Sequence, residues 1–491
     1  MNGIGMTSIQ IPELSFSLIA PELILCTAAI VILLVDLYVK NVERINITLL
    51  ALIGIVLAFF SAGTLYGASE LAFSWLIIRD DMSVVIDQIF LIGAALIVLM
   101  SHHYSERYHF PYGEYIVLLL FSTLGMLIIS ASADLITLFL GVELVSITLF
   151  VLTGFEKKSL LSGEASLKYL LLGAFSSAFM VYGIAFIFGM CRTTNLISIG
   201  SLLSEDFIGS PLLILGFALL LVGLGFKIAL APFHMWAPDV YQGAPTPITA
   251  WIAAGSKLAG FIALVRVFSL PDISFHPLAR TWVEGIWWLS LLTMIIGNAG
   301  ALVQKDIKRM LAYSSIAHGG YLSMAFVSHN DVGLQALLFY LAAYLFMTIG
   351  AFAVVIAAGR HGEERRRISD FAGLAKRRPF LAAMMSLFLL SLAGMPPTAG
   401  FIGKVWLFGS AIQAQYYGLA IVGILTTLFS FYYYLRVIVY MYMRDEEKEF
   451  EAEPLSVSLT LALSLSALGV LILGVFPNTL MKVITNSVIV L

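Results

Sequence analysis

The sequence carries little charge and few cysteines for its length. Of 491 residues, 27 are Lys or Arg and 30 are Asp or Glu, which makes 12% of the chain charged. A soluble globular protein carries roughly 25% charged residues, so this chain cannot cover a water-soluble surface. A net charge of −3 without a long basic tract argues against a nucleic-acid partner. With two cysteines, Cys26 and Cys191, we expect neither an all-cysteine iron–sulfur cluster nor a structural zinc site.

Long apolar runs take up most of the chain, and 60% of the residues are hydrophobic. The runs are continuously apolar rather than alternating, which indicates membrane helices and not a β-barrel. The sequence therefore predicts an all-α polytopic membrane protein with about fourteen transmembrane helices. We expect the spans near residues 17–38, 46–66, 82–100, 113–131, 134–154, 168–190, 211–241, 246–269, 284–303, 308–327, 333–358, 379–413, 416–441 and 455–476.

The distribution of Lys and Arg predicts the orientation of these spans. When connections alternate between two sides, most basic residues fall on one side, with the largest cluster at 360–378. Basic loops stay in the cytoplasm. We therefore expect a cytoplasmic 359–378 loop and both termini on the opposite, outer side of the membrane.

Four charged residues fall inside apolar spans. They are Lys227, Lys257, Lys404 and Glu143. Each costs about 2.5–3.5 kcal/mol at a helix centre on insertion scales. One interpretation is structural, with Glu143 neutralising Lys227, although this leaves two lysines unpaired. The other is a proton relay, because desolvation lets a buried lysine release its proton near neutral pH.

Two spans are long and contain helix breakers. The seventh contains Pro232 in KIALAPFHMW, and the twelfth contains Pro396 and Pro397 in LAGMPPTAGFIGK. Broken helices at corresponding positions of two halves are typical of transport sites. Since the broken spans are five apart, we predict two inverted five-helix repeats, spans 4–8 and 9–13. The expected division of the single membrane domain is 1–112, 113–270, 284–441 and 442–491. A proline kink that only tunes packing is the alternative for either break alone.

Other polar residues in the spans are weaker candidates. His234 lies seven residues after Lys227, and is either a relay member or a partner for backbone freed at the break. His318 is either a satisfied core histidine or a proton carrier. Asp36 and Asp87 lie near span edges, where we expect them to be interfacial.

Three stretches carry a family resemblance. They are KIALAPFHMWAPDVYQGAPTPITAWIAAGSK at 227–257, GVELVSITLFVL at 141–152 and KRMLAYSSIAHGGY at 308–321. The chain resembles the antiporter-like membrane subunits of proton-pumping NADH:quinone oxidoreductase, complex I. With Lys404 in the twelfth span, the chain resembles the N-type branch of this family, which includes mitochondrial subunit 2. M-type and L-type subunits usually have Glu or Asp at that position.

The resemblance implies roles for these residues. Glu143 and Lys227 would be an ion pair of the fifth and seventh spans, Lys257 the central relay lysine and Lys404 the terminal proton-exchange lysine. His318 matches a polar position of the tenth span. The chain itself would bind no cofactor, since NADH, FMN, iron–sulfur clusters and quinone belong to other subunits. Its partners would be the M-type and K-type subunits and lipids.

Two alternatives to a redox-driven proton translocator remain. One is a cation/proton antiporter, acting alone or in a multisubunit exchanger. Three lysines to one carboxylate argue against a Na⁺ site, which uses carboxylates and carbonyls. The other is a scaffold subunit with vestigial lysines.

Overall fold

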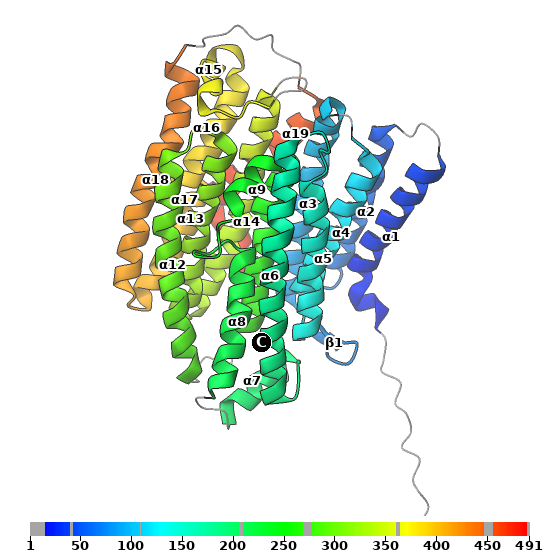
Figure 1. The fold of residues 1–491 in the computed structure, drawn as a ribbon, viewed down its shortest axis with the longest axis vertical. Helices are drawn as coiled ribbons and strands as arrows, with labels where there is room; N and C mark the ends of the chain where they lie inside the picture. Colours follow the sequence, from blue (N-terminus) through cyan, green and yellow to red (C-terminus); the bar gives the residue numbers. More distant parts are fainter. Residues whose placement is uncertain are drawn as a thin grey trace, which may run out of the picture.

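The computed structural model describes residues 15–39, 43–108, 110–205, 210–268, 277–359, 364–445 and 455–488. In these ranges the chain is a bundle of long helices that run between two ends (Figure 1). Eleven helices of the described residues are long and apolar enough to cross a membrane. The prediction of an all-α polytopic membrane protein is confirmed at this level.

The bounds of the elements follow the apolar runs closely. The first half contains η1 (Phe16–Ile19), α1 (Ala20–Tyr38), α2 (Arg44–Gly63), β1 (Glu70–Ala72), β2 (Ile77–Arg79), α3 (Asp81–Tyr108), α4 (Tyr112–Ser130), α5 (Leu135–Thr153), α6 (Leu160–Cys191), α7 (Leu196–Glu205), α8 (Pro211–Lys227), α9 (Ala237–Gly243), α10 (Thr246–Trp251), the π-helical turn η2 (Ile252–Ser256) and α11 (Lys257–Phe268). The second half contains α12 (Pro277–Val303), α13 (Ile307–Ser328), α14 (Asp331–Ala358), η4 (Ile368–Phe371), α15 (Leu374–Arg377), α16 (Pro379–Ala393), α17 (Ala399–Gln413), α18 (Tyr417–Met443), α19 (Val457–Val475) and α20 (Pro477–Val488).

Several short elements lie outside the predicted spans. They are the antiparallel hairpin of β1 and β2, the short helices α7, η4 and α15, and the terminal helix α20. The hairpin pairs Glu70 with Arg79. These elements are too short or too polar to produce a hydrophobic run of spanning length.

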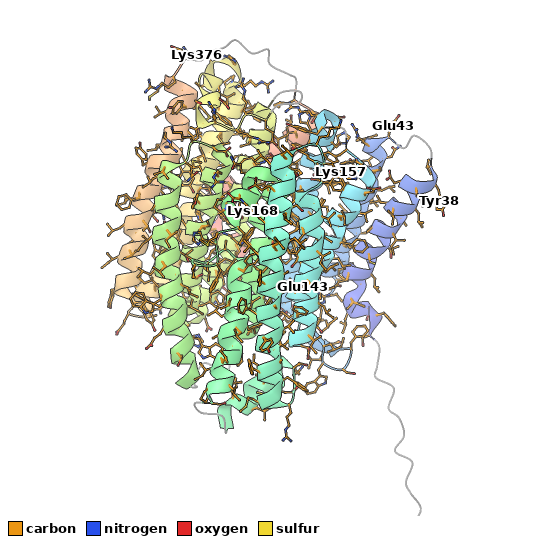
Figure 2. The ribbon with its side chains drawn as sticks, viewed as in Figure 1. Tyr38, Glu43, Glu143, Lys157, Lys168 and Lys376 are labelled. Atoms are coloured by element: carbon orange, nitrogen blue, oxygen red, sulfur yellow. The ribbon has the colours of Figure 1, made fainter. Side chains whose placement is uncertain are left out.

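The two ends of the bundle differ in charge. Lys157 and Lys376 lie toward the same end, together with Glu43, whereas Glu143 lies between the ends (Figure 2). We call the end with Lys157 and Lys376 the basic end. The β1–β2 hairpin lies at the other end (Figure 1), which we call the hairpin end. The termini lie outside the described residues, so their placement on the outer side of the membrane stays a prediction.

Several helices begin at a side chain that accepts a hydrogen bond from the first turn. Asp134 accepts from Ile136 N at 2.8 Å at the start of α5, and Asp306 accepts from Arg309 N at 3.0 Å at the start of α13. Asn330 does the same for α14. Such caps satisfy backbone N–H groups that a helix cannot pair internally, and so they position the helix starts.

The innermost helices are α14 and the continuous segment α10–η2–α11, whose apolar windows are almost completely buried. Outer helices such as α2, α6 and α18 instead expose large apolar side chains, for example Phe60, Phe175 and Leu428. This apolar surface suits lipid, because a soluble monomer rarely exposes large contiguous apolar patches. The buried charges therefore lie in a protein core that is itself surrounded by an apolar shell.

Helices α6 and α8 pack closely at a pair of glycines, Gly183 and Gly216. A Cβ atom added at Gly183 would lie 2.5 Å from Gly216 O and 2.8 Å from Leu220 N, both backbone atoms that cannot rotate away. Small residues at membrane helix interfaces allow this approach. Gly189 on the same helix has no atom within 4 Å of an added Cβ.

We predict that Gly183→Ala lowers the thermal stability of the purified protein because α8 must move away from α6. Gly189→Ala is the matched control, and should be neutral or slightly stabilising because Ala is the better helix former by roughly 1 kcal/mol. Thermal unfolding in detergent measures both variants. Equal stability of the two would show that the α6–α8 contact is not as tight as described.

Candidate functional site

Lys227 is the last residue of α8, and its ammonium group is almost completely buried. It donates a hydrogen bond to Ser146 Oγ on α5, and its charge interacts with that of Glu143, one turn earlier on α5. The Glu143 carboxylate accepts a hydrogen bond from Ser177 on α6. Within the described part of the chain no direct ion pair joins Glu143 to Lys227. The two charges are therefore close enough to interact, but each has its own serine partner.

The chain leaves the helical conformation after Lys227 and becomes helical again at Ala237. Polar atoms freed by this gap find partners. Ala231 N donates to Thr293 Oγ1 on α12 at 2.9 Å, and Trp236 Nε1 donates to Phe226 O at 3.0 Å. His234 lies in this gap, and its buried Nδ1 has no hydrogen-bond partner among the described residues. The imidazole does interact with the backbone of Pro232 in the same gap, which agrees with a partner for backbone freed at the break.

Lys257 lies directly after the π-helical turn η2 and is 1% exposed. Its ammonium donates to the backbone carbonyl of Ser315 on α13. The Ser315 hydroxyl in turn lies 3.3 Å from the hydroxyl of Tyr241 on α9. A π-turn is uncommon within α-helices and often occurs at functional sites.

His318 contacts two tyrosine hydroxyls and lies within electrostatic reach of the central and terminal lysines. Its Nδ1 lies 2.7 Å from Tyr340 Oη, and its Nε2 lies 3.2 Å from Tyr434 Oη. Tyr434 also hydrogen-bonds to Ser314, the neighbour of the residue that binds Lys257. The lysines that interact electrostatically with His318 are Lys404 and Lys257. The imidazole thus lies between two lysines, with both ring nitrogens on hydroxyl groups that can pass a proton.

Lys404 lies in the first half of α17 and is 3% exposed. Its ammonium donates to the carbonyls of Leu392 at 2.9 Å and Ala393 at 3.0 Å, at the C-terminus of α16. Those carbonyls have no partner within their own helix and carry the negative end of its dipole. Gly394, with φ of 90°, ends α16 in the left-handed conformation. The end of one helix therefore provides the site for a cation carried by the next.

A second cluster, at the basic end, was not recognised in the sequence. Lys308 is the second residue of α13, and its side chain is completely buried. It donates to Ala244 O at 2.7 Å and Thr246 Oγ1 at 3.1 Å, and it pairs with Glu364 at 3.3 Å. Nothing local marks it, because a basic residue at a span edge is expected in any membrane protein.

Two carboxyl groups share this cluster. The Tyr104 hydroxyl lies 2.9 Å from Glu364 Oε1 and also hydrogen-bonds to Glu156. Burial raises the pKa of Glu156 above its ordinary value, and the charge of Glu364 adds to this. Burial alone would also raise the pKa of Glu364, but Lys308 together with Thr246, Arg366 and Tyr104 holds that pKa below its ordinary value. The surroundings therefore shift the pKa values of Glu156 and Glu364 in opposite directions.

The fold and the line of buried lysines define a polytopic membrane protein of the antiporter-like class. The family model for NADH:quinone oxidoreductase/Mrp antiporter transmembrane proteins matches residues 132–430. The chain belongs to this family, and the resemblance inferred from the three sequence stretches is confirmed.

Curated relatives cover most of the chain. A protein of Trichlorobacter lovleyi named NADH-quinone oxidoreductase subunit N is 46% identical over 86% of each chain. A protein of the same name from Chloroflexus aggregans is 42% identical over 87% of this chain and 88% of its own.

Solved structures share the fold. A chain of respiratory complex I from Thermus thermophilus with bound aureothin has a TM-score of 0.80 and 33% identity, covering 94% of this chain and 98% of its own. A chain of an archaeal membrane-bound sulfane sulfur reductase has a TM-score of 0.85 at 23% identity, covering 96% of each chain, a likeness of fold alone.

We predict opposite effects of Glu364→Gln and Glu156→Gln on stability at neutral pH. Glu364, with its lowered pKa, stabilises the fold above the ordinary Glu value of about 4.3, and this contribution is lost as pH falls through its folded pKa. Its loss leaves Lys308 without its ion pair, at a cost of about 1–3 kcal/mol. Glu156, with its raised pKa, costs stability once pH rises above its ordinary value, so Glu156→Gln should be neutral or stabilising at pH 7.

Thermal unfolding of the two variants and the parent, measured from neutral pH down to about pH 4, checks this pair. The difference in thermal stability between Glu364→Gln and Glu156→Gln should become smaller as the medium becomes acidic. A gap that does not change with pH would contradict the opposite tuning of the two carboxyls.

Proposed function

We propose that this chain is an N-type subunit of the membrane arm of a proton-pumping NADH:quinone oxidoreductase. The observation that carries the proposal is the buried polar line from Lys227 through Lys257 and His318 to Lys404, in a chain whose curated relatives are named subunit N. Electron transfer takes place in other subunits, which hold NADH, FMN, iron–sulfur clusters and quinone. This chain contributes proton transport to the enzyme.

The proposed architecture consists of two inverted five-helix repeats after three N-terminal helices. The first repeat is α4, α5, α6, α8 with α9, and α10 through α11. The second is α12, α13, α14, α16 with α17, and α18. In support, the fourth member of each set is interrupted, between Lys227 and Ala237 and between Ala393 and Ala399. In transporters, interrupted helices at matching positions of two repeats surround the ion path.

In the proposed mechanism, redox chemistry elsewhere changes the distance between Glu143 and Lys227. A carboxylate close to a lysine favours the charged ammonium, and its withdrawal favours proton release. The change in charge at Lys227 acts electrostatically on Lys257, then on His318, and finally on Lys404. Lys404 exchanges a proton through hydrated half-channels. Moving one charge across the membrane costs about 2.3 kcal/mol per 100 mV, so the transport needs the energy of the redox reaction.

The subunit's neighbours are expected to be M-type and K-type membrane-arm subunits and lipids, in a bacterial inner membrane with the basic end toward the cytoplasm. In support, the matching Thermus thermophilus chain comes from respiratory complex I. The antiporter alternative has weaker support, because three buried lysines lie with a single, partly buried carboxylate, Glu143, whereas a site for a metal cation needs oxygen ligands.

We predict that Lys404→Arg keeps the complex assembled but lowers coupled proton pumping by about a hundredfold, the lower end of what positioned proton transfer contributes. Arg retains a charge that can bind the α16 carbonyls, but it does not release its proton. NADH:quinone turnover and proton uptake into inverted vesicles measure the effect. Lys157→Arg, at an exposed position, is the control. Full pumping by Lys404→Arg would favour the scaffold alternative.

We predict that Lys227→Ala lowers pumping to a similar extent, because Glu143 then has no lysine to modulate. The assembled complex is checked on native gels before transport is measured. Copurification of the unmodified chain without any redox subunit, together with Na⁺/H⁺ exchange by the isolated protein, would favour the antiporter alternative instead.

A further inference from the structure

Two buried arginines lie at the hairpin end of the bundle, away from the lysine line. Arg79 ends strand β2 and is 0% exposed, and Arg266 lies on α11 and is 5% exposed. Both are linked to Ser130 on α4. The Ser130 hydroxyl donates to Asp87, a partner of Arg79, and the Ser130 carbonyl accepts from Arg266. Burying an arginine requires counter-charges close by, so the balance of acids around each one is informative.

Arg266 has a complete partner set. Its two terminal nitrogens bind both oxygens of Asp80, at 2.7 Å and 2.8 Å, and its Nε donates to Ser130 O at 2.8 Å. This is a bidentate pair of one cation and one anion. It is neutral as it stands and has no place for another proton.

Arg79 instead lies between two carboxylates. It donates to Asp87 Oδ2 at 2.6 Å, to Glu22 Oε1, and through Nε to Leu18 O at 2.8 Å. Asp87 is completely buried rather than interfacial as the sequence suggested, and its Oδ1 accepts from Ser130. Glu22 is 7% exposed, and its Oε2 is buried with no hydrogen-bond partner among the described residues.

The count of charges leaves one acid in excess. Glu22, Asp80 and Asp87 face Arg79 and Arg266, so full ionisation would bury a net negative charge. Asp81 and Glu70 lie beside the cluster with solvent access: Asp81 accepts from Gly67 N, and Glu70 is exposed opposite Arg79 in the hairpin. The further acids of the same helices, Asp36 on α1 and Glu106 on α3, lie near the far ends of those helices. Two carboxylates that share one buried cation are stabilised when one of them holds a proton. The unpartnered Glu22 Oε2 is the atom where that proton fits.

We propose that Glu22, Asp87 and Arg79 form an exchangeable proton-binding site, a station of the transport path at the hairpin end. The carboxyl pair of Glu22 and Asp87 holds one proton, and Arg79 stabilises the remaining carboxylate. The station is tied to the lysine line because Ser130 bridges it to Arg266, nine residues after Lys257 on α11 and about 14 Å along that helix. The role in transport rests on the proposed function, whereas the binding of a proton does not.

Infrared spectroscopy of the purified complex tests the proton itself, independently of transport. Glu22→Gln and Asp87→Asn each leave Arg79 with one carboxylate, so the cluster stays neutral and should remain folded. We expect the parent to show a protonated-carboxyl C=O band at neutral pH that disappears as pH rises, and both variants to lack it. Glu70→Gln, at the exposed hairpin position, should keep it. Retention of the band by both variants, or its loss in Glu70→Gln as well, would contradict the proposed proton-binding site.

The pH profile of proton pumping tests the station. We expect Glu22→Gln and Asp87→Asn to assemble normally and to pump at least about twofold more slowly, with a pH profile that differs from that of the parent and of Glu70→Gln. Unchanged pumping at every pH would overturn the role in transport. The proposed function fails by a separate result, full pumping by Lys404→Arg, so the two failures can be told apart.

Discussion

The structure depends on how a lysine ammonium is held inside an apolar bundle. A charge in this environment is costly unless hydrogen-bond acceptors surround it. The chain supplies them mainly from oxygens that are already present for other reasons. Lys404 binds carbonyls at the end of α16, and Lys257 binds a carbonyl of α13. These partners are dipoles rather than full counter-charges. They solvate the ammonium without holding its proton as a carboxylate would, which suits a group that must both bind and release protons.

Interrupted helices follow from the same requirement. A continuous helix pairs most of its carbonyls internally, whereas the break after α16 leaves the carbonyls of Leu392 and Ala393 free to accept from Lys404. The break also frees N–H groups, and the fold satisfies these by packing, as Thr293 does for Ala231. Around the breaks, short α9 is held by Asp239, which pairs with Lys168 at 2.6 Å and Arg309 at 2.5 Å. Charge at the basic end thus fixes the segment that leads to Lys257.

Much of the fold was predictable because membrane insertion is a local property. Each apolar run is long enough to be recognised as a span without knowledge of its neighbours. The predicted helix positions therefore agree with the structure to within a few residues at most spans. The hairpin and α7 were missed because they do not cross the membrane. The prediction that Asp87 is interfacial was wrong for a different reason. Its position near a span edge suggested solvent or headgroups, whereas packing buries it completely. Packing buries Lys308, at the start of another span, in the same way.

The sequence by itself determined that this is a membrane protein, where its helices lie and which lysines stand in apolar surroundings. A charged residue within twenty apolar ones is conspicuous whatever the fold. Only the tertiary structure decided what each charge faces. Lys308 meets Glu364, Arg79 meets Glu22, and His318 meets Tyr434, pairs that are 56, 57 and 116 residues apart in sequence. Such partners are selected by the packing of distant helices, and no local pattern of residues records that choice.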